Sequence, residues 1–236
     1  RANFFLKYSN ALQTVRVIDT TAKNAVSTTG QTAAATSAGL PTEVVKNEAS
    51  FNSQLSGLDS DLHTFVAKYP GALGNSLQVS LCPHSANDSA FNAWTYKGEF
   101  DAPPGTSSFA TKKTATNDEL HAVVVDKTGK FTGTKGTVLE RYAFASVGKN
   151  AKDDAGSNIF IKDLLNETSE YVWMIDFDSD FKGTLASKSA AGTDIDSGDN
   201  FTKTTGTTNR AINYNFDSGV NVAALSDGQV QTGYDL

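Results

Sequence analysis

The chain has 236 residues, 39% of them hydrophobic, and a formal net charge of -6. This length can bury one sizeable core but not two large independent ones. The acidic balance excludes a basic footprint for phosphates, so nucleic acid and an acidic membrane surface are poor partners. No apolar run approaches the roughly 18 to 20 residues that a membrane-spanning helix needs.

The first twenty residues predict a helix followed by a strand. Residues 1–10 have the pattern of an amphipathic helix, and residues 13–18 alternate apolar and polar side chains as a half-buried strand does. The chain starts at Arg1, inside the helical pattern, and stops at Leu236 without a tail, which suggests a fragment excised from a longer protein. A signal peptide is not visible, although one could have been lost with a missing N-terminus.

A polar stretch then precedes a short helix. Residues 22–40 are almost entirely small and polar, so we expect a flexible loop, placed at residues 24–45, that cannot repay the entropy of ordering. Phe51, Leu55 and Leu58 have the spacing of one helical face, and the following Ser-Gly pair frays that helix.

The segment FVAKYPGALGN at residues 65–75 raises the question of a phosphate-binding loop. Lys68 precedes the glycines, whereas a Walker loop needs its lysine after the last glycine, and a strand pattern follows where a helix should begin. We therefore interpret Pro70-Gly71 as the centre of a type II turn and Gly74-Asn75 as a second turn.

The remaining elements follow in chain order. Residues 77–81 and 120–126 predict strands, and the second should form a hairpin whose return strand begins at Phe131. Further predictions are a helix at 137–147, a helix at 159–167, a strand at 169–177, and irregular or marginal strands around Ile212, Tyr214 and Phe216.

These elements do not alternate in a regular strand-helix rhythm, and many connections have hairpin length. The expected class is α+β, with a mainly antiparallel, sandwich-like sheet core and several short flanking helices.

Two aspartate-rich segments match the pattern of a calcium-binding loop only in part. Asp176, Asp178 and Asp180 have the spacing of a calcium loop, but Phe181 occupies the position of the obligatory glycine and Ser187 that of the closing glutamate. The segment DIDSGD at 194–199 is a weaker version of the same pattern. A solvated acidic turn is the better interpretation of both.

The cysteine, histidine and serine residues also lack the spacing of a metal site or of a catalytic nucleophile. Cys82 and His84 are two residues apart, but His63 and His121 lack ligand-like spacing, so a buried strand-end cysteine is favoured over a metal site. A single cysteine cannot form an internal disulfide and suits a reducing compartment. No serine lies in a nucleophile elbow, so the sequence gives no sign of a hydrolase. We expect no enzyme, cofactor or metal, and a metal-dependent enzyme built on Asp176, Asp178 and Asp180 remains an alternative.

A glycan-binding surface is the alternative function. Trp94 and Tyr96 could be stacking platforms, against the interpretation that they fill the edge of the core together with Phe91. Three Asn-x-Ser/Thr sequences occur at a frequency expected by chance, at Asn87, Asn166 and Asn200.

Several ordered motifs resemble the contractile tail sheath proteins of large tailed bacteriophages. FVAKYPGALGNSLQVSLC resembles that family's KYPG..GN stretch leading into a core strand. Further similar segments follow the family's order: NFFLKYSNALQTVRVID, NDELHAVVVDKTG, TVLERYAFAS, NIFIKDLLNETSEYVW and DGQVQTGYDL. The resemblance leaves only residues 24–45 and 180–210 without a clear counterpart.

The resemblance implies a structural role in the virion. Sheath subunits assemble in the host cytoplasm as six-fold rings around a tail tube on a baseplate, and contraction drives the tube through the host envelope. The energy lies in two packings of the same subunits, so no catalysis is required.

Two departures limit what the resemblance implies. The T-even type carries an outer domain inserted before the KYPG motif, whereas the chain here has only the polar loop at 24–45, so we expect one outer sheath domain with a core of about 1–23 and 46–236. The domain that lines the tube would lie beyond residue 236, and contacts with tube and baseplate would need such missing regions. We therefore expect this chain alone to be monomeric.

Overall fold

The computed structural model describes residues 18, 21–28, 41, 43–58, 62–182, 190–202, 211–222, 225, 226 and 228. The predicted N-terminal helix and nearly all of the strand at 13–18 lie outside these residues. Within them, no helix has the length and apolar character to cross a bilayer. The strands are β1 (Asn24–Thr28), β2 (Phe65–Pro70), β3 (Leu77–Pro83), β4 (Glu119–Asp126), β5 (Thr137–Ser146), β6 (Val172–Met174) and β7 (Ile212–Asp217). The α-helices are α2 (Glu48–Gln54), α3 (Ser89–Ala93), α4 (Ser108–Lys112), α5 (Ile161–Thr168) and α6 (Ser179–Lys182).

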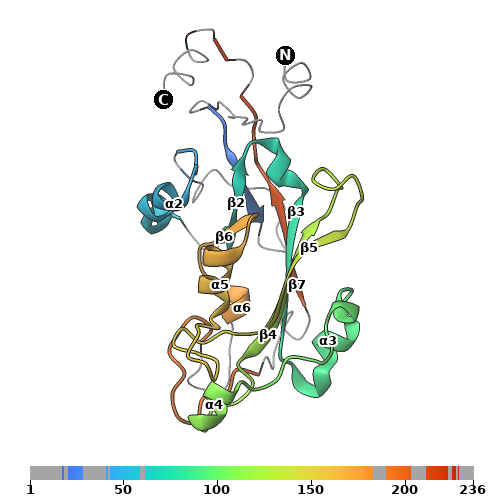
Figure 1. Cartoon of the computed structure of the whole chain (residues 1–236), viewed down its shortest axis with the longest axis vertical. Coiled ribbons are helices and arrows are strands. Elements are labelled where there is room, and N and C mark those ends of the chain that lie inside the picture. The colour runs from blue at the N-terminus through green and yellow to red at the C-terminus, as the bar shows by residue number, and fades with distance from the viewer. Residues whose placement is uncertain are drawn as a thin grey trace, which may run out of the picture.

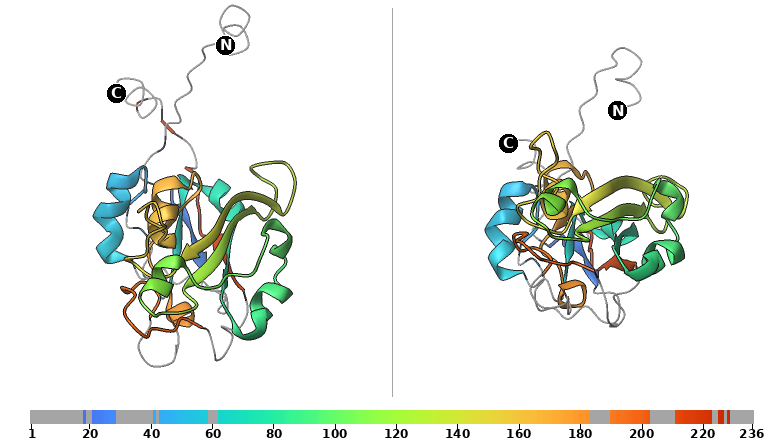
Figure 2. Two further views of the ribbon diagram at one scale, coloured as in Figure 1. Left: turned by 60° about the horizontal axis from the view of Figure 1, so that its bottom comes forward. Right: turned by 90° about the horizontal axis from the view of Figure 1, so that it is seen from below.

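All seven strands belong to one sheet in the order β5-β4-β3-β7-β1-β2-β6 (Figure 1). Every pairing between neighbouring strands is antiparallel. The short helices flank this sheet (Figure 2). The expected α+β class with an antiparallel sheet core is therefore confirmed.

Both faces of the sheet are covered, which explains the continuous apolar run in β4. Leu120, Ala122 and Val124 face the main core cluster, which also contains residues of β3, α5 and β7. Val123 and Val125 face a separate cluster that includes Trp94. A third cluster packs Phe51 of α2 against the outer side of β1, β2 and β6. A strand buried on both sides loses the apolar-polar alternation of a half-exposed strand.

Several predicted elements are present at their expected positions. The helix carrying Phe51 is α2, and a 3-10 turn at Leu55–Gly57 follows it where the Ser-Gly pair was expected to fray it. The strands at 77–81, 120–126 and 169–177 correspond to β3, β4 and β6, and the helix at 159–167 corresponds to α5.

The predicted helix at 137–147 is wrong, because these residues form β5. β5 pairs with β4 along its length, and the register shifts between Leu120 and Ala122 and between Val124 and Val125. Each shift adds a residue on the β5 side, so Leu139, Tyr142 and Ala145 contact the main core at intervals of three. β-bulges therefore produced the spacing that resembled a helical face.

The predicted flexible loop at 24–45 is wrong at both of its ends. Residues 24–28 form β1, an interior strand between β7 and β2, and Val44 and Val45 are buried. The polar Asn24 is stable there because its amide donates to the carbonyls of Val45 and Ala67 and accepts from Val45 N. Residues 29–40 and 42 lie outside the described residues.

Two further expectations need correction. The return strand of the β4 hairpin begins at Thr137 instead of Phe131, because Asp126 organises residues 127–136 into an ordered loop. The C-terminal strand β7 is an interior strand paired with both β3 and β1, so it is not marginal. Its Tyr214 is fully buried and packs edge-on against Phe65.

Candidate functional site

The KYPG segment, which we define as KYPGALGN at residues 68–75, joins β2 to β3 and contacts four other parts of the fold. It lies at the end of the sheet where β1 begins and β7 ends (Figure 1). Lys23 and Val220 exchange two backbone hydrogen bonds beside it, at 3.0 and 3.1 Å. The segment is therefore placed to hold the residues before β1 and the residues after β7 against the sheet.

Lys68 connects β2 to the C-terminal end of α5. Its ammonium donates to the carbonyls of Ser169 and Asn166 and lies 3.7 Å from the ring centroid of Trp173. A cation at this end of a helix offsets the partial negative charge of the last carbonyls. Burial lowers the pKa of Lys68, while the carboxylates of Glu140, Glu48 and Glu170 act to raise it.

Replacing Lys68 by Met should lower the free energy of unfolding by about 1–2 kcal/mol, because the aliphatic packing stays while the cation-ring and carbonyl contacts are lost. Urea denaturation followed by fluorescence measures this change. The control is Lys97→Met, because Lys97 also donates to a carbonyl, that of Asn92, but at an exposed position. Equal midpoints for the two variants would show that the Lys68 contacts contribute nothing to stability.

Tyr69 connects the same segment to the β4–β5 loop. Its ring packs edge-on against Phe131 at 5.5 Å and lies 6.1 Å from Tyr171. Phe131 and Tyr171 complete the triangle at 5.4 Å. Because Phe131 follows β4 and Tyr171 precedes β6, this cluster draws opposite edges of the curled sheet together.

The glycines are required by geometry rather than by a ligand. Gly71 has φ 103° and ψ -177°, a conformation that glycine alone adopts readily, although this ψ is wrong for the predicted type II turn. Gly74 has no room for a side chain, since an added Cβ would lie 2.8 Å from the Cβ atoms of Ala25 and Ala67. Asn75 accepts from Gly219 N and donates to Gly219 O, which fastens the end of β7.

Three backbone amides of this loop, where a phosphate would need donors, already donate within the protein: Gly71 to Lys23 O, Ala72 to Asn221 Oδ1 and Gly74 to Gly71 O. The ammonium of Lys68 already donates to the carbonyls of Ser169 and Asn166. The interpretation of the motif as part of the scaffold agrees with this geometry.

The structure describes two side chains of the calcium-like pattern, and these have separate partners. Asp176 forms an ion pair with Lys182 at 2.9 Å, and Asp178 accepts from Phe181 N and Thr64 Oγ1. Asp178 is buried, so the expected solvated acidic turn is wrong at this residue. The side chain of Asp180 and the whole of Ser187 lie outside the described residues. In the described part of the chain, no group of three or more His, Cys, Asp or Glu could hold a metal ion.

The cysteine and the histidines have separate structural partners. Cys82 is buried, which raises the pKa of its thiol to about 12. His63 contacts Ser27 O through Nδ1, and His84 contacts Pro104 O through its own Nδ1. His121 contacts Ala102 O through Nε2 and accepts from Phe144 N at Nδ1, and burial lowers its pKa.

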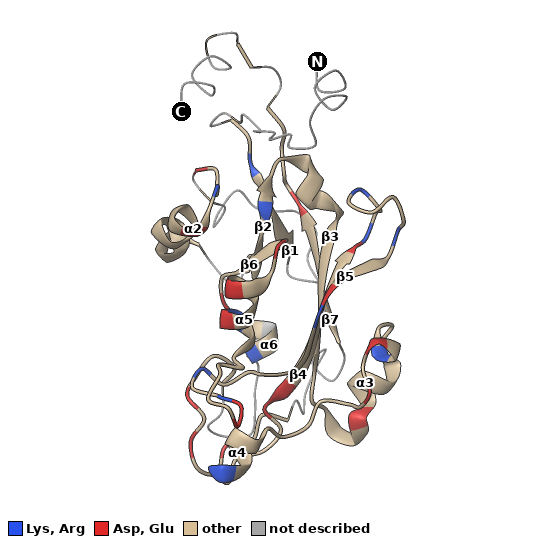
Figure 3. Ribbon diagram, viewed as in Figure 1, with Lys and Arg blue, Asp and Glu red and all other residues tan. Residues whose placement is uncertain are grey.

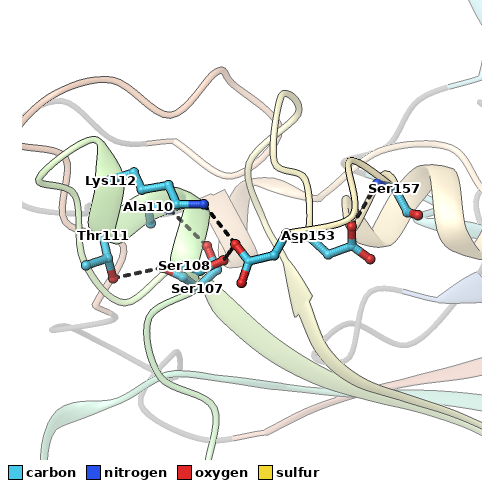
Figure 4. Close-up of polar contacts among 8 residues, drawn as sticks. Ser107, Ser108, Ala110, Thr111, Lys112, Asp153 and Ser157 are labelled. Atoms are coloured by element: carbon cyan, nitrogen blue, oxygen red, sulfur yellow. Dashed lines mark hydrogen bonds and ion pairs between the residues drawn. The ribbon is translucent and has the colours of Figure 1, made fainter.

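The Ser- and Asp-rich cluster around α4 is also structural. The hydroxyl of Ser107 accepts from Ala110 N and so caps the start of α4 (Figure 4). Lys112 forms an exposed ion pair with Asp154, and Asp153 accepts from Ser157 N (Figure 4). The Ser107 and Asp153 contacts shape a helix end and a turn, and the ion pair joins α4 to the connection between β5 and α5.

The aromatic residues proposed as a glycan platform belong to the core. Trp94 is only 5% exposed, and its indole donates to Ser80 Oγ at 2.8 Å. Tyr96 packs edge-on against it and donates to Gln78 Oε1. Trp94 therefore offers no open ring face to a sugar, and the interpretation as core filling is correct.

Asn166 has a structural role that the sequence pattern did not reveal. Its amide accepts from Met174 N and donates to Met174 O, so it occupies the outer edge of β6 as another strand would. Neither an Asn-x-Ser/Thr sequence nor helical spacing indicates such a contact. The other two asparagines of this type are Asn87, which has a positive φ of 54°, and Asn200, which accepts from Thr202 N.

No protein-family model matches the chain. Over 134 residues, 57% of its length, it is 31% identical to the "Tail sheath protein" of Salmonella phage ViI. The chain is similar to a phage tail sheath protein. The aligned part is 17% of that relative's length, so the chain corresponds to a small part of it.

Proposed function

We propose that this chain is one outer domain of a contractile tail sheath subunit. The similarity to the tail sheath protein of Salmonella phage ViI carries the proposal. In the intact protein, six-fold rings of subunits would surround the tail tube and contract to drive it through the host envelope. The subunit would assemble in the host cytoplasm and reside in the virion tail, with tube and baseplate bound through other parts of the protein.

The KYPG segment suits a domain that moves as a rigid body. Lys68, Tyr69 and Asn75 attach it to α5, to the β4–β5 loop and to the end of β7 respectively. Contraction between two packings requires that displacement at one contact reach another without being absorbed inside the domain. The sheet and these attachments form one domain in the proposal.

Immunogold electron microscopy of the virions that encode this chain tests the proposal. Antibodies raised against the 236-residue chain should label the tail along its length in extended and contracted particles. Labelling confined to capsids or tail fibres would contradict the sheath assignment.

A second measurement addresses the chain by itself. We expect it to sediment as a monomer and to form no tubes, because the contacts of a complete ring would need the rest of the subunit. Tubular polymers of this chain alone in electron micrographs would refute that expectation.

A further inference from the structure

A strained bulge lies in β5, the strand at one edge of the sheet. Where the register between β4 and β5 shifts, Ala143 and Phe144 of β5 lie opposite His121 alone. Phe144 has a φ of 52°, a left-handed conformation that is rare for a bulky side chain, and it is 37% exposed. The bulge therefore depends on the contacts that hold Phe144 in this conformation.

His121 holds Phe144 through a hydrogen bond that fixes the protonation state of the imidazole. Nδ1 of the buried ring lies 3.0 Å from Phe144 N, and Nε2 lies 2.8 Å from Ala102 O. An amide nitrogen can only donate and a carbonyl oxygen can only accept, so Nδ1 presents its lone pair and Nε2 carries the proton. A second proton, on Nδ1, would point at the N–H of Phe144. Only the neutral ring can therefore keep both contacts.

The surroundings of the His121 ring are aromatic. Phe100 stacks on it with the ring centroids 4.2 Å apart and an interplanar angle of 5°, and Phe144 packs edge-on at 4.6 Å. Phe91 and Trp94 lie at 5.8 and 6.4 Å. A charge placed among these rings loses its hydration. Burial accordingly lowers the pKa of His121, against backbone hydrogen bonds that act to raise it.

The titratable groups around His121 do not set the direction of this shift. The titratable residues of the elements packed against its ring are Cys82 of β3 and His84 after it, Glu119 of β4, Arg141 of β5, Asp88 before α3, and Lys97, Glu99 and Asp101 after α3. Figure 3 marks the acidic and basic residues of β4 and β5. Arg141 pairs with Glu99 at 3.0 Å, and Glu119 accepts from Gly105 N. Burial, and not a neighbouring charge, therefore lowers the pKa of His121.

We infer that His121 is a pH-sensitive switch at the edge of the sheet: the neutral ring holds the bulge of β5, and a proton on Nδ1 releases Phe144 from it. After protonation the amide of Phe144 loses its acceptor, and this hydrogen bond no longer offsets the cost of the positive φ. Because β5 is an edge strand, Phe144 can move without separating the interior strands. Acid would therefore change the surface at this edge and leave the rest of the sheet in place. The switch does not depend on the proposed sheath role.

An NMR titration of the 236-residue chain tests the switch. The ring nitrogens of His121 should report a proton on Nε2 alone at neutral pH and should titrate below about 6.5, the ordinary pKa of histidine. The amide resonance of Phe144 should shift with the same midpoint. Its protection from hydrogen exchange should fall by about tenfold, as expected for the loss of one hydrogen bond, while the amides of β3 keep theirs.

Replacing His121 by Asn separates the switch from other acid-sensitive groups. The Oδ1 of Asn can accept from Phe144 N but does not titrate, so the variant should keep this amide protected in acid. Because the folded pKa is lowered, the contribution of His121 to stability is complete above about pH 6.5 and is lost as the pH falls toward the folded pKa. His121→Asn should lack this loss. The control is His84→Asn, which removes a histidine that contacts Pro104 O and should retain both effects.

Three results would overturn the inference. The first is a His121 midpoint above about 6.5, as a cation stabilised by the ring of Phe100 would have. The second is a Phe144 amide whose resonance and protection do not follow the His121 midpoint, and the third is an acid response that persists in His121→Asn. The titration of the parent chain decides the question even if His121→Asn fails to fold.

Discussion

Replacing Asp126 by Asn is expected to lower the free energy of unfolding by about 3 kcal/mol. The carboxylate accepts six hydrogen bonds, from Ser76, from Thr132 twice and from three further amides of the β4–β5 loop. Asn has one acceptor oxygen, and its amide donors would face groups that are themselves donors, so several buried donors lose their partner. Urea denaturation at neutral pH measures the loss, with the exposed Asp101→Asn as the control.

The pH dependence of stability provides a second measurement of the same contact. Burial acts to raise the pKa of Asp126, but the hydrogen bonds from Ser76, Thr132 and Phe131 outweigh it and lower the pKa. A carboxyl whose pKa is lower in the folded state stabilises the protein fully above its unfolded pKa of about 4. That contribution disappears as the pH falls through the folded pKa, and Asp126→Asn should lack this part of the acid dependence. Parallel acid profiles of the variant and the parent would contradict the assignment.

Replacing Gly74 by Ala is expected to cost about 2–3 kcal/mol, because the new methyl group would lie 2.8 Å from the Cβ atoms of Ala25 and Ala67. Neither neighbour can rotate away, since both contacts are made by Cβ atoms of interior strands. β1 and β2 would have to move apart from the turn. Thermal and urea denaturation measure the loss.

The matched control for Gly74 is Gly98→Ala. Gly98 also lies in a 3-10 turn, but an added Cβ there meets nothing within 4 Å. We expect this change to leave stability within about 0.5 kcal/mol of the parent. Similar losses at both positions would mean that helical propensity or the unfolded chain, instead of packing, sets the cost at Gly74.

The sequence predicted β3, β4 and β6 as strands, because apolar residues decide the structure locally there. β3 and β4 have apolar runs that only strands buried on one or both faces explain. β5 was mistaken for a helix because two bulges gave its inner side chains a spacing of three. β1 was mistaken for a loop because its polar Asn24 and Ser27 are stabilised by partners distant in sequence.

The KYPG motif was likewise predictable in its local chemistry but not in its distant contacts. The order of lysine and glycines alone excluded a phosphate loop, because that chemistry needs a defined local arrangement of amides and lysine. Which residues the motif contacts could not be predicted, since Lys68 and Asn75 bind partners about 100 and 144 positions away.

Local chemistry therefore determined what the sequence by itself could show: the α+β class, the absence of known catalytic motifs, and glycines that shape turns. Only the tertiary structure decided that β1 and β7 are interior strands, that Lys68 holds the end of α5, and that Trp94 is core. These outcomes depend on contacts between distant segments, whose free energy exceeds the local preferences of small and polar residues.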